Sequence, residues 1–104
     1  MQILFFDSKT ETFIRSLRPA AIVKLLRTLN LLERFGHQLG MPHSKSVGGG
    51  IFELRVRGIQ EVRLLYVFQK DHIVILHGFV KKTDKISSKD LTIAQRNNKL
   101  LDTI

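Results

Sequence analysis

The feature that most constrains the fold is a change of hydrophobic period at the glycine run Gly48–Gly50. Upstream, between residues 8 and 36, apolar side chains recur every three or four positions, the spacing of one helix face. Downstream, apolar residues at positions 52, 54 and 56 alternate with charged residues at positions 53, 55 and 57, the spacing of a half-buried strand. A helical segment followed by a run of strands predicts the α+β class.

Before the glycine run we expect a strand and two helices. Residues 3–6 form a short apolar run, typical of a strand buried on both faces. Ser8, with Glu11 three positions later, has the spacing of a helix-capping box. Pro19 suits the first position of a second helix, which is expected to stop at Gly36. The two helices should form an antiparallel hairpin whose apolar stripe faces the core.

The remaining chain is expected to hold a loop, three strands and a helix. Residues 36–50 contain five of the seven glycines and no periodicity, so they are expected to form the loop. We expect strands over residues 52–57, 61–68 and 72–80, and a helix over residues 89–101 capped by Ser87 or Ser88. Residues 1–104 are then a single domain of order β-α-α-β-β-β-α, in which the helical hairpin and the C-terminal helix pack on an antiparallel sheet.

The chain is strongly basic, with a formal net charge of +8. Residues 1–52 hold seven cationic and three acidic side chains, and residues 53–104 hold ten and six, so the excess is spread evenly. This charge favours a nucleic acid or an acidic protein as partner, without separating the two. There is no cysteine, no signal-peptide pattern and no apolar stretch near the ~20 residues that cross a membrane, so we expect a cytoplasmic protein.

The residues most able to carry chemistry lie between positions 50 and 85. Glu53, Arg55 and Arg57 share one face of the first strand after the glycines, because side chains alternate along a strand. Whether Arg63 on the next strand shares that face depends on the register. Near or after the last strand come His77, Lys81, Lys82 and Lys85.

Such a group of cations and proton carriers suits the cleavage of an RNA phosphodiester. The 2′-hydroxyl of RNA is itself the nucleophile, so the protein needs only a proton acceptor, a proton donor and cations for the phosphate oxygens. Arginine suits the last task because its planar fork binds phosphate through two hydrogen bonds. The four histidines lack metal-ligand spacing and the glycine run does not open a helix after a strand, so neither a metal nor a nucleotide cofactor is expected.

Three segments resemble the HigB-type, phage-derived branch of the RelE/ParE toxin superfamily. The resemblance extends over essentially the whole chain, including the order of its elements. The segments read ELR at positions 53–55, RLLY at 63–66 and HGFVKKT at 77–83, and the loop LGMPHSK at 39–45 is also similar. The resemblance implies a toxin of a type II toxin–antitoxin pair, a ribosome-associated endoribonuclease that cuts translated mRNA and is inhibited by a cognate antitoxin, of helix-turn-helix type or acidic, in a hetero-oligomer.

The resemblance also assigns roles to individual residues. Arg55 matches a substrate-contacting basic residue, Arg63 an arginine that stabilises the transition-state phosphate, and Lys82 or Lys81 the cation at the scissile phosphate or leaving group. Tyr66 matches an aromatic position that either contacts RNA or packs in the core. The remaining predicted phosphate-binding cations are Arg57, Lys45 and Lys85.

The sequence departs from the superfamily pattern in ways that bear on the proton acceptor. Some relatives carry a tyrosine near the C-terminal end, where this chain reads Ile-Ser-Ser-Lys over residues 86–89. Glu53 stands where some ribonucleases of the superfamily carry a lysine. Glu53, His77 and His43 therefore remain alternative proton acceptors.

Two other functions are open to a chain with these features. A ParE-type toxin with the same fold poisons DNA gyrase by binding and cuts nothing. A catalytically degenerate module would only bind its partner. For each candidate residue, a structural role competes with the functional one. Arg63 could form an ion pair with Glu53 or Glu61 across the strands. Arg55 and Arg57 could belong to a solvated strand face, and His77 could occupy a hydrogen-bonded core position.

Overall fold

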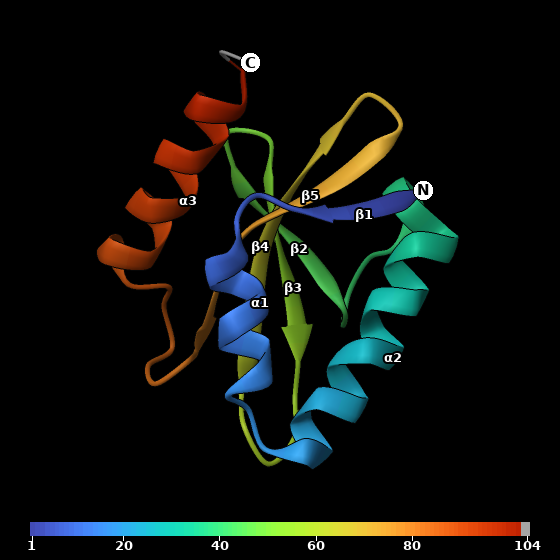
Figure 1. The fold of residues 1–104 in the computed structure, drawn as a ribbon, viewed down its shortest axis with the longest axis vertical. Coiled ribbons are helices and arrows are strands. Elements are labelled where there is room, and N and C mark those ends of the chain that lie inside the picture. The colour runs from blue at the N-terminus through green and yellow to red at the C-terminus, as the bar shows by residue number, and fades with distance from the viewer. Residues whose placement is uncertain (103–104) are drawn as a thin grey trace.

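The computed structural model describes residues 1–102 and contains a five-stranded sheet with helices on both faces (Figure 1). The elements in chain order are β1 (Gln2–Phe5), α1 (Ser8–Arg15), α2 (Pro19–Phe35), a 3₁₀ turn η1 (Gly36–Gln38), β2 (Ser44–Gly48), β3 (Ile51–Val56), β4 (Val62–Gln69), β5 (His72–Val80) and α3 (Ser88–Asp102). The α+β class and the antiparallel β3–β4–β5 meander are thereby confirmed. No helix in the described part of the chain is long and apolar enough to span a membrane.

The N-terminal strand differs from its prediction. β1 is the edge strand of the sheet and pairs in parallel with β5. Its side chains alternate between exposed and half-buried, so the expected burial on both faces is wrong. The helix cap is also different: the carboxylate of Asp7 accepts a hydrogen bond from the amide of Lys9 at 3.1 Å, and Ser8 is already the first helical residue.

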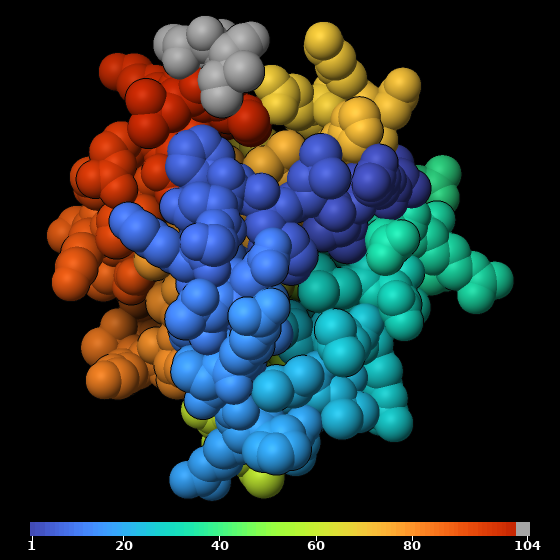
Figure 2. Space-filling view, viewed as in Figure 1, coloured from blue at the N-terminus to red at the C-terminus, as the bar shows by residue number. Residues whose placement is uncertain are grey.

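The second helix follows its prediction closely. Pro19 occupies its first turn, and Gly36 ends it with a φ of +52°, a left-handed value that favours glycine. α1 and α2 run in roughly opposite directions and cover one face of the sheet, the face toward the viewer in Figure 1 and in Figure 2. The buried stripe of α2 packs on Leu54, Val56 and Leu64 of the sheet, so it forms core.

The loop expected over residues 36–50 contains a strand that the sequence did not reveal. β2 pairs antiparallel with β3, with Ser44 opposite Leu54, and forms the other edge of the sheet. Its sequence, SKSVG, has a single apolar residue because an edge strand buries little, so no alternation marks it. The glycines at 48–50 make the tight turn into β3, all with positive φ.

The opposite face of the sheet carries a second apolar core. Its sheet residues, which include Leu65, Val67 and Leu76, pack on Ala94 of α3. The Ser87 cap is confirmed: its hydroxyl accepts from the amide of Asp90 at 3.1 Å and donates to the Asp90 carboxylate at 2.6 Å. This side of the sheet, facing α3, also holds the candidate site.

Candidate functional site

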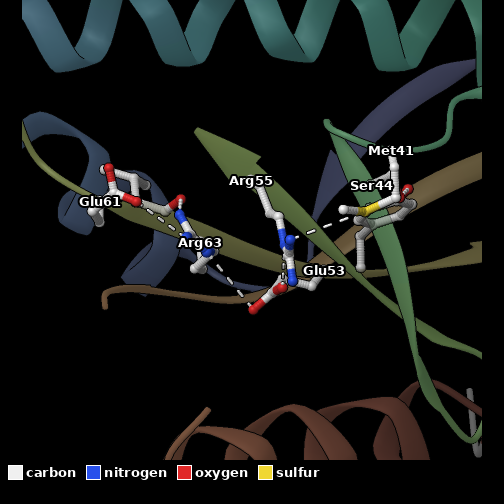
Figure 3. Close-up of polar contacts among 8 residues, drawn as sticks. Met41, Ser44, Glu53, Arg55, Glu61 and Arg63 are labelled. Atoms are coloured by element: carbon white, nitrogen blue, oxygen red, sulfur yellow. Dashed lines mark hydrogen bonds and ion pairs between the residues drawn. The ribbon is translucent and has the colours of Figure 1, made fainter. Parts of the chain in front are cut away.

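The register of β3 and β4 settles which of the predicted residues share a face. Arg55 lies directly opposite Arg63, and Glu53 lies opposite Leu65. Residues opposite each other in an antiparallel pair point to the same face. Glu53, Arg55 and Arg63 therefore all point toward the α3 side, where Figure 3 shows the Glu53 carboxylate between the two guanidinium groups.

Glu53 is a buried carboxylate held by two arginines. Its Oε1 accepts from Arg55 Nε at 2.9 Å, and its Oε2 lies 3.8 Å from Arg63 Nε. The side chains of Glu53 and Arg63 are each only 3% exposed, whereas that of Arg55 is 13% exposed. Burial in a medium of low dielectric strengthens these attractions, so the three side chains form one charged unit, called here the Glu53 triad.

Arg63 is oriented by two hydrogen bonds at one end of its guanidinium group. Its Nη1 donates to the carbonyl oxygen of Val62 at 3.0 Å and its Nη2 donates to Glu61 Oε1 at 3.2 Å. The 3.8 Å separation from Glu53 is too long for a hydrogen bond, and both Arg63 Nε and Glu53 Oε2 are buried without a hydrogen-bond partner among the described residues. A buried donor and a buried acceptor thus retain their capacity to bind a polar group.

Glu61 helps to fix Arg63 from the exposed end of the site. Slight desolvation acts to raise its pKa, but hydrogen bonds from the Gly58 amide and Arg63 outweigh this and hold the pKa below its ordinary value. Because its pKa is lower in the folded protein, the ion pair of Glu61 with Arg63 stabilises the fold fully at pH values above the ordinary pKa of glutamate. This stabilisation is lost as the pH falls through the folded-state pKa. At neutral pH Glu61 is therefore an anion that orients Arg63.

Two adjoining depressions border the Glu53 triad, and we call them together the cationic groove. One, of about 330 Å³, is lined by Arg57, Glu61, Arg63, Lys81, Lys82, Thr83 and Asp84. The other, of about 210 Å³, is lined by Lys45, Val47, Glu53, Arg55, Lys81, Asp84, Lys85 and Ile86. The lining includes seven cationic and three acidic side chains, so the groove attracts anions.

The structure thus brings eight of the ten predicted site residues together and separates two. The eight are Lys45, Glu53, Arg55, Arg57, Arg63, Lys81, Lys82 and Lys85. Sequence reasoning missed Asp84, which lines both depressions, and saw Glu61 only as an ion-pair partner. No residue pattern marks Asp84, since an acid in a lysine-rich turn is ordinary.

His77 does not belong to the groove. Its Nε2 lies 2.7 Å from Oδ1 of Asp90, whose other oxygen is held by Ser87. This contact ties β5 to the first turn of α3, across the loop that carries three of the four lysines of the groove. The expected catalytic role of His77 is not supported, and its hydrogen-bonded structural role is. His43 also lies outside the groove lining, which leaves Glu53 as the candidate proton acceptor.

Tyr66 lies on the opposite face of the sheet. Its side chain is 1% exposed, stacks beside Phe52, and its hydroxyl forms a short hydrogen bond with that of Ser44. Tyr66 therefore packs in the core, and the expected contact with an RNA phosphate is wrong for this structure.

The burial of Tyr66 gives a prediction that absorbance measures directly. Burial raises the pKa of the Tyr66 hydroxyl, and the hydrogen bond with Ser44 lowers it by less. Because the chain has one tyrosine and no tryptophan, the 295 nm absorbance reports Tyr66 alone. In the folded protein we expect the midpoint of the tyrosine titration to lie above the ordinary tyrosine pKa. In urea the midpoint should return to that ordinary pKa, and in folded Ser44→Ala it should rise further. Stability should accordingly fall as the pH rises above the ordinary tyrosine pKa. A normal midpoint in the folded protein contradicts this burial.

Within residues 1–102, no three histidine, aspartate or glutamate side chains gather as a metal site would require. The site therefore consists of organic cations around a buried carboxylate. The fold and the groove together define a small α+β protein with one strongly cationic face.

The chain belongs to a known family. Residues 12–99 match the family described as "Phage derived protein Gp49-like (DUF891)", which is part of the RelE/HigB-like toxin grouping. This span includes α2, the whole β2–β5 meander and every residue of the cationic groove. No curated protein gives a significant match to the chain.

Proposed function

We propose that the protein is a HigB-type toxin that cleaves RNA as a metal-independent endoribonuclease, with translated mRNA on the ribosome as its substrate. The observation that carries this proposal is the Glu53 triad beneath a rim of lysines. Two arginines and a carboxylate, fixed by mutual contacts, offer the charge stabilisation and the proton acceptor that cleavage by the 2′-hydroxyl needs.

The proposed reaction uses residues of the groove for each transfer. The 2′-oxygen attacks the phosphorus while its proton passes to Glu53. The bond to the 5′-oxygen breaks, and that oxygen takes a proton from Lys82 or Lys81, leaving a 2′,3′-cyclic phosphate and a 5′-hydroxyl. Arg63 and Arg55 stabilise the charge on the non-bridging oxygens through charge-assisted hydrogen bonds.

The burial of the triad favours cleavage over simple binding. A surface that only binds a polyanion or a protein places its cations in solvent, where they form contacts without preorganisation. Here Arg63 is almost fully buried, donates to two acceptors, Val62 and Glu61, and forms a longer ion pair with Glu53. A gyrase-poisoning toxin and a binding-only module need no such arrangement. The proposed inhibitor is a cognate helix-turn-helix or acidic antitoxin, whose charge complements the basic chain in a hetero-oligomer.

The experiment that tests the proposal is expression of the protein followed by primer extension on cellular transcripts. We expect new 5′ ends within translated codons. Lys82→Ala, an exposed change that leaves the core intact, should lower cleavage roughly 10²-fold if the lysine protonates the leaving oxygen. Arg27→Gln, an exposed change on α2, is the matched control and should cleave normally. Intact transcripts together with gyrase-dependent DNA breaks overturn the proposal.

A further inference from the structure

A pocket outside the cationic groove lies between α1, β5 and α3. It has a volume of about 260 Å³, and its lining includes Lys9, Thr10, Phe13, Arg96 and Asn97. β1 pairs with β5 only as far as Ile75, so the pocket occupies the place beside residues 76–78 where no strand follows. The volume is below the ~300–1,000 Å³ of pockets for drug-sized ligands, so it admits a single small unit.

Two largely buried residues of the pocket lining carry polar atoms that have unused hydrogen-bonding capacity and are not fully buried. Thr10 is only 3% exposed, and its hydroxyl makes no hydrogen bond with any residue in the described range 1–102. The buried side chain of Asn97 donates through Nδ2 to the carbonyl oxygen of Leu76 at 2.8 Å, which leaves its Oδ1 as an acceptor. A hydroxyl and an amide oxygen placed together suit the edge of a nucleobase, which offers both donors and acceptors.

The other walls supply a ring and two cations. The Phe13 ring packs over the bare backbone of Gly78: a β-carbon there would lie 2.8 Å from the ring. Lys9 and Arg96 stand exposed on the two helices and form no ion pair within the described residues. The lining carboxylate of Asp7 is engaged in capping α1, and His77 is held by Asp90. Aromatic walls stack bases, and paired cations bind phosphate.

One intervening depression links the pocket to the proposed cleavage site. It shares Phe13 and Gly78 with a neighbouring depression of about 540 Å³. That depression in turn shares Lys81, Lys82 and Thr83 with the cationic groove. The shared lining residues place the pocket, the neighbouring depression and the cationic groove side by side, in the order in which an RNA strand would meet them.

We propose that this pocket binds one nucleoside monophosphate unit, the nucleotide of an RNA strand that lies near the scissile phosphate in the cationic groove. Its base stacks on Phe13 and hydrogen-bonds to Thr10 and Asn97, while its phosphate binds Lys9 and Arg96. The assignment of the ligand to an RNA strand rests on the proposed function. The recognition chemistry is that of the pocket itself.

The test is an NMR titration of the full chain with three probes: free nucleoside 5′-monophosphates, a short 2′-O-methylated RNA that resists cleavage, and an oligoglutamate peptide. We expect the RNA to shift the amides of Thr10, Gly78 and Asn97. Arg96→Gln should weaken RNA binding roughly tenfold and Thr10→Val roughly fivefold. Thr12→Val on α1 and Lys99→Gln on α3, both exposed and outside this pocket, are the matched controls and should bind normally.

Each outcome of the titration separates the two proposals. Shifts with the free nucleotide as well as with RNA show that the pocket binds a nucleotide whether it is free or part of a strand. Shifts with RNA alone show that it binds a nucleotide only within a strand. A protein that cleaves RNA but shows no shift at the pocket overturns the pocket and leaves the proposed function standing. A protein that binds nucleotide in the pocket but cleaves no RNA overturns the proposed function and leaves the pocket assignment standing. Shifts with oligoglutamate alone assign the pocket to an acidic protein partner and overturn the nucleotide assignment.

Discussion

Arg63→Met is expected to lower the rate of RNA cleavage roughly 10²–10³-fold, the loss typical of removing one preorganised donor from a transition-state site. The guanidinium is fixed by hydrogen bonds to Val62 and Glu61 before any substrate arrives, and Glu53 lies 3.8 Å from its Nε. No reorganisation is then needed when charge develops on the phosphate. Methionine keeps the length and the apolar character of the buried stem and removes only the charged fork.

The loss must be separated from unfolding, because Arg63 also pairs with a buried carboxylate. Cleavage should therefore be measured at a temperature where circular dichroism shows that the variant is folded. Arg15→Met, at the exposed end of α1, is the matched control and should cleave at the wild-type rate. Cleavage within about threefold of wild type by folded Arg63→Met removes Arg63 from the mechanism. Arg63→Lys should recover only part of the rate, since a lysine offers charge without the planar fork.

The fold could be predicted where local rules decide the structure. The α2 boundaries follow from Pro19 and Gly36, whose backbone preferences hold in any context. β2 was not predictable, because an edge strand of polar residues is defined by its hydrogen bonds to β3 and not by its own pattern. β1 was assigned the wrong burial for a related reason: four apolar residues in a row do not tell a central strand from an edge strand.

The candidate site was predictable as a set of residues but not as an arrangement. The alternation of residues 53–57 places the acid and the arginines on one face, yet the sequence does not give the register that sets Arg55 opposite Arg63. From the sequence, Glu53 looks like part of a solvated charged face. In the structure it is buried, because α3 and the lysine-bearing loop lie on that side of the sheet. His77 and Tyr66 were misassigned because their partners, Asp90 and Ser44, are distant in sequence.

Glu53→Ala is expected to lower the free energy of unfolding by about 3–5 kcal/mol, because it removes the buried carboxylate that faces both Arg55 and the buried Arg63. Urea unfolding at neutral pH measures the change. Glu61→Ala is the matched control, since it removes a carboxylate from the same arginine. It should cost only about 0–1 kcal/mol, because the Glu61 side chain is 44% exposed and its pair is screened by solvent. Equal effects of the two substitutions contradict the buried Glu53 triad.

The double variant Glu53→Leu/Arg63→Met tells whether the pair is kept for stability or for chemistry. Replacing both partners of a buried ion pair with apolar side chains of similar volume is often neutral or stabilising. We therefore expect the double variant to regain most of the stability that Glu53→Ala loses, with a favourable coupling between the two sites. RNA cleavage should remain as low as in Arg63→Met, because the proton acceptor and the phosphate-binding fork are both absent. A double variant that is stable and still cleaves RNA shows that the pair serves the fold alone and that the catalytic groups lie elsewhere.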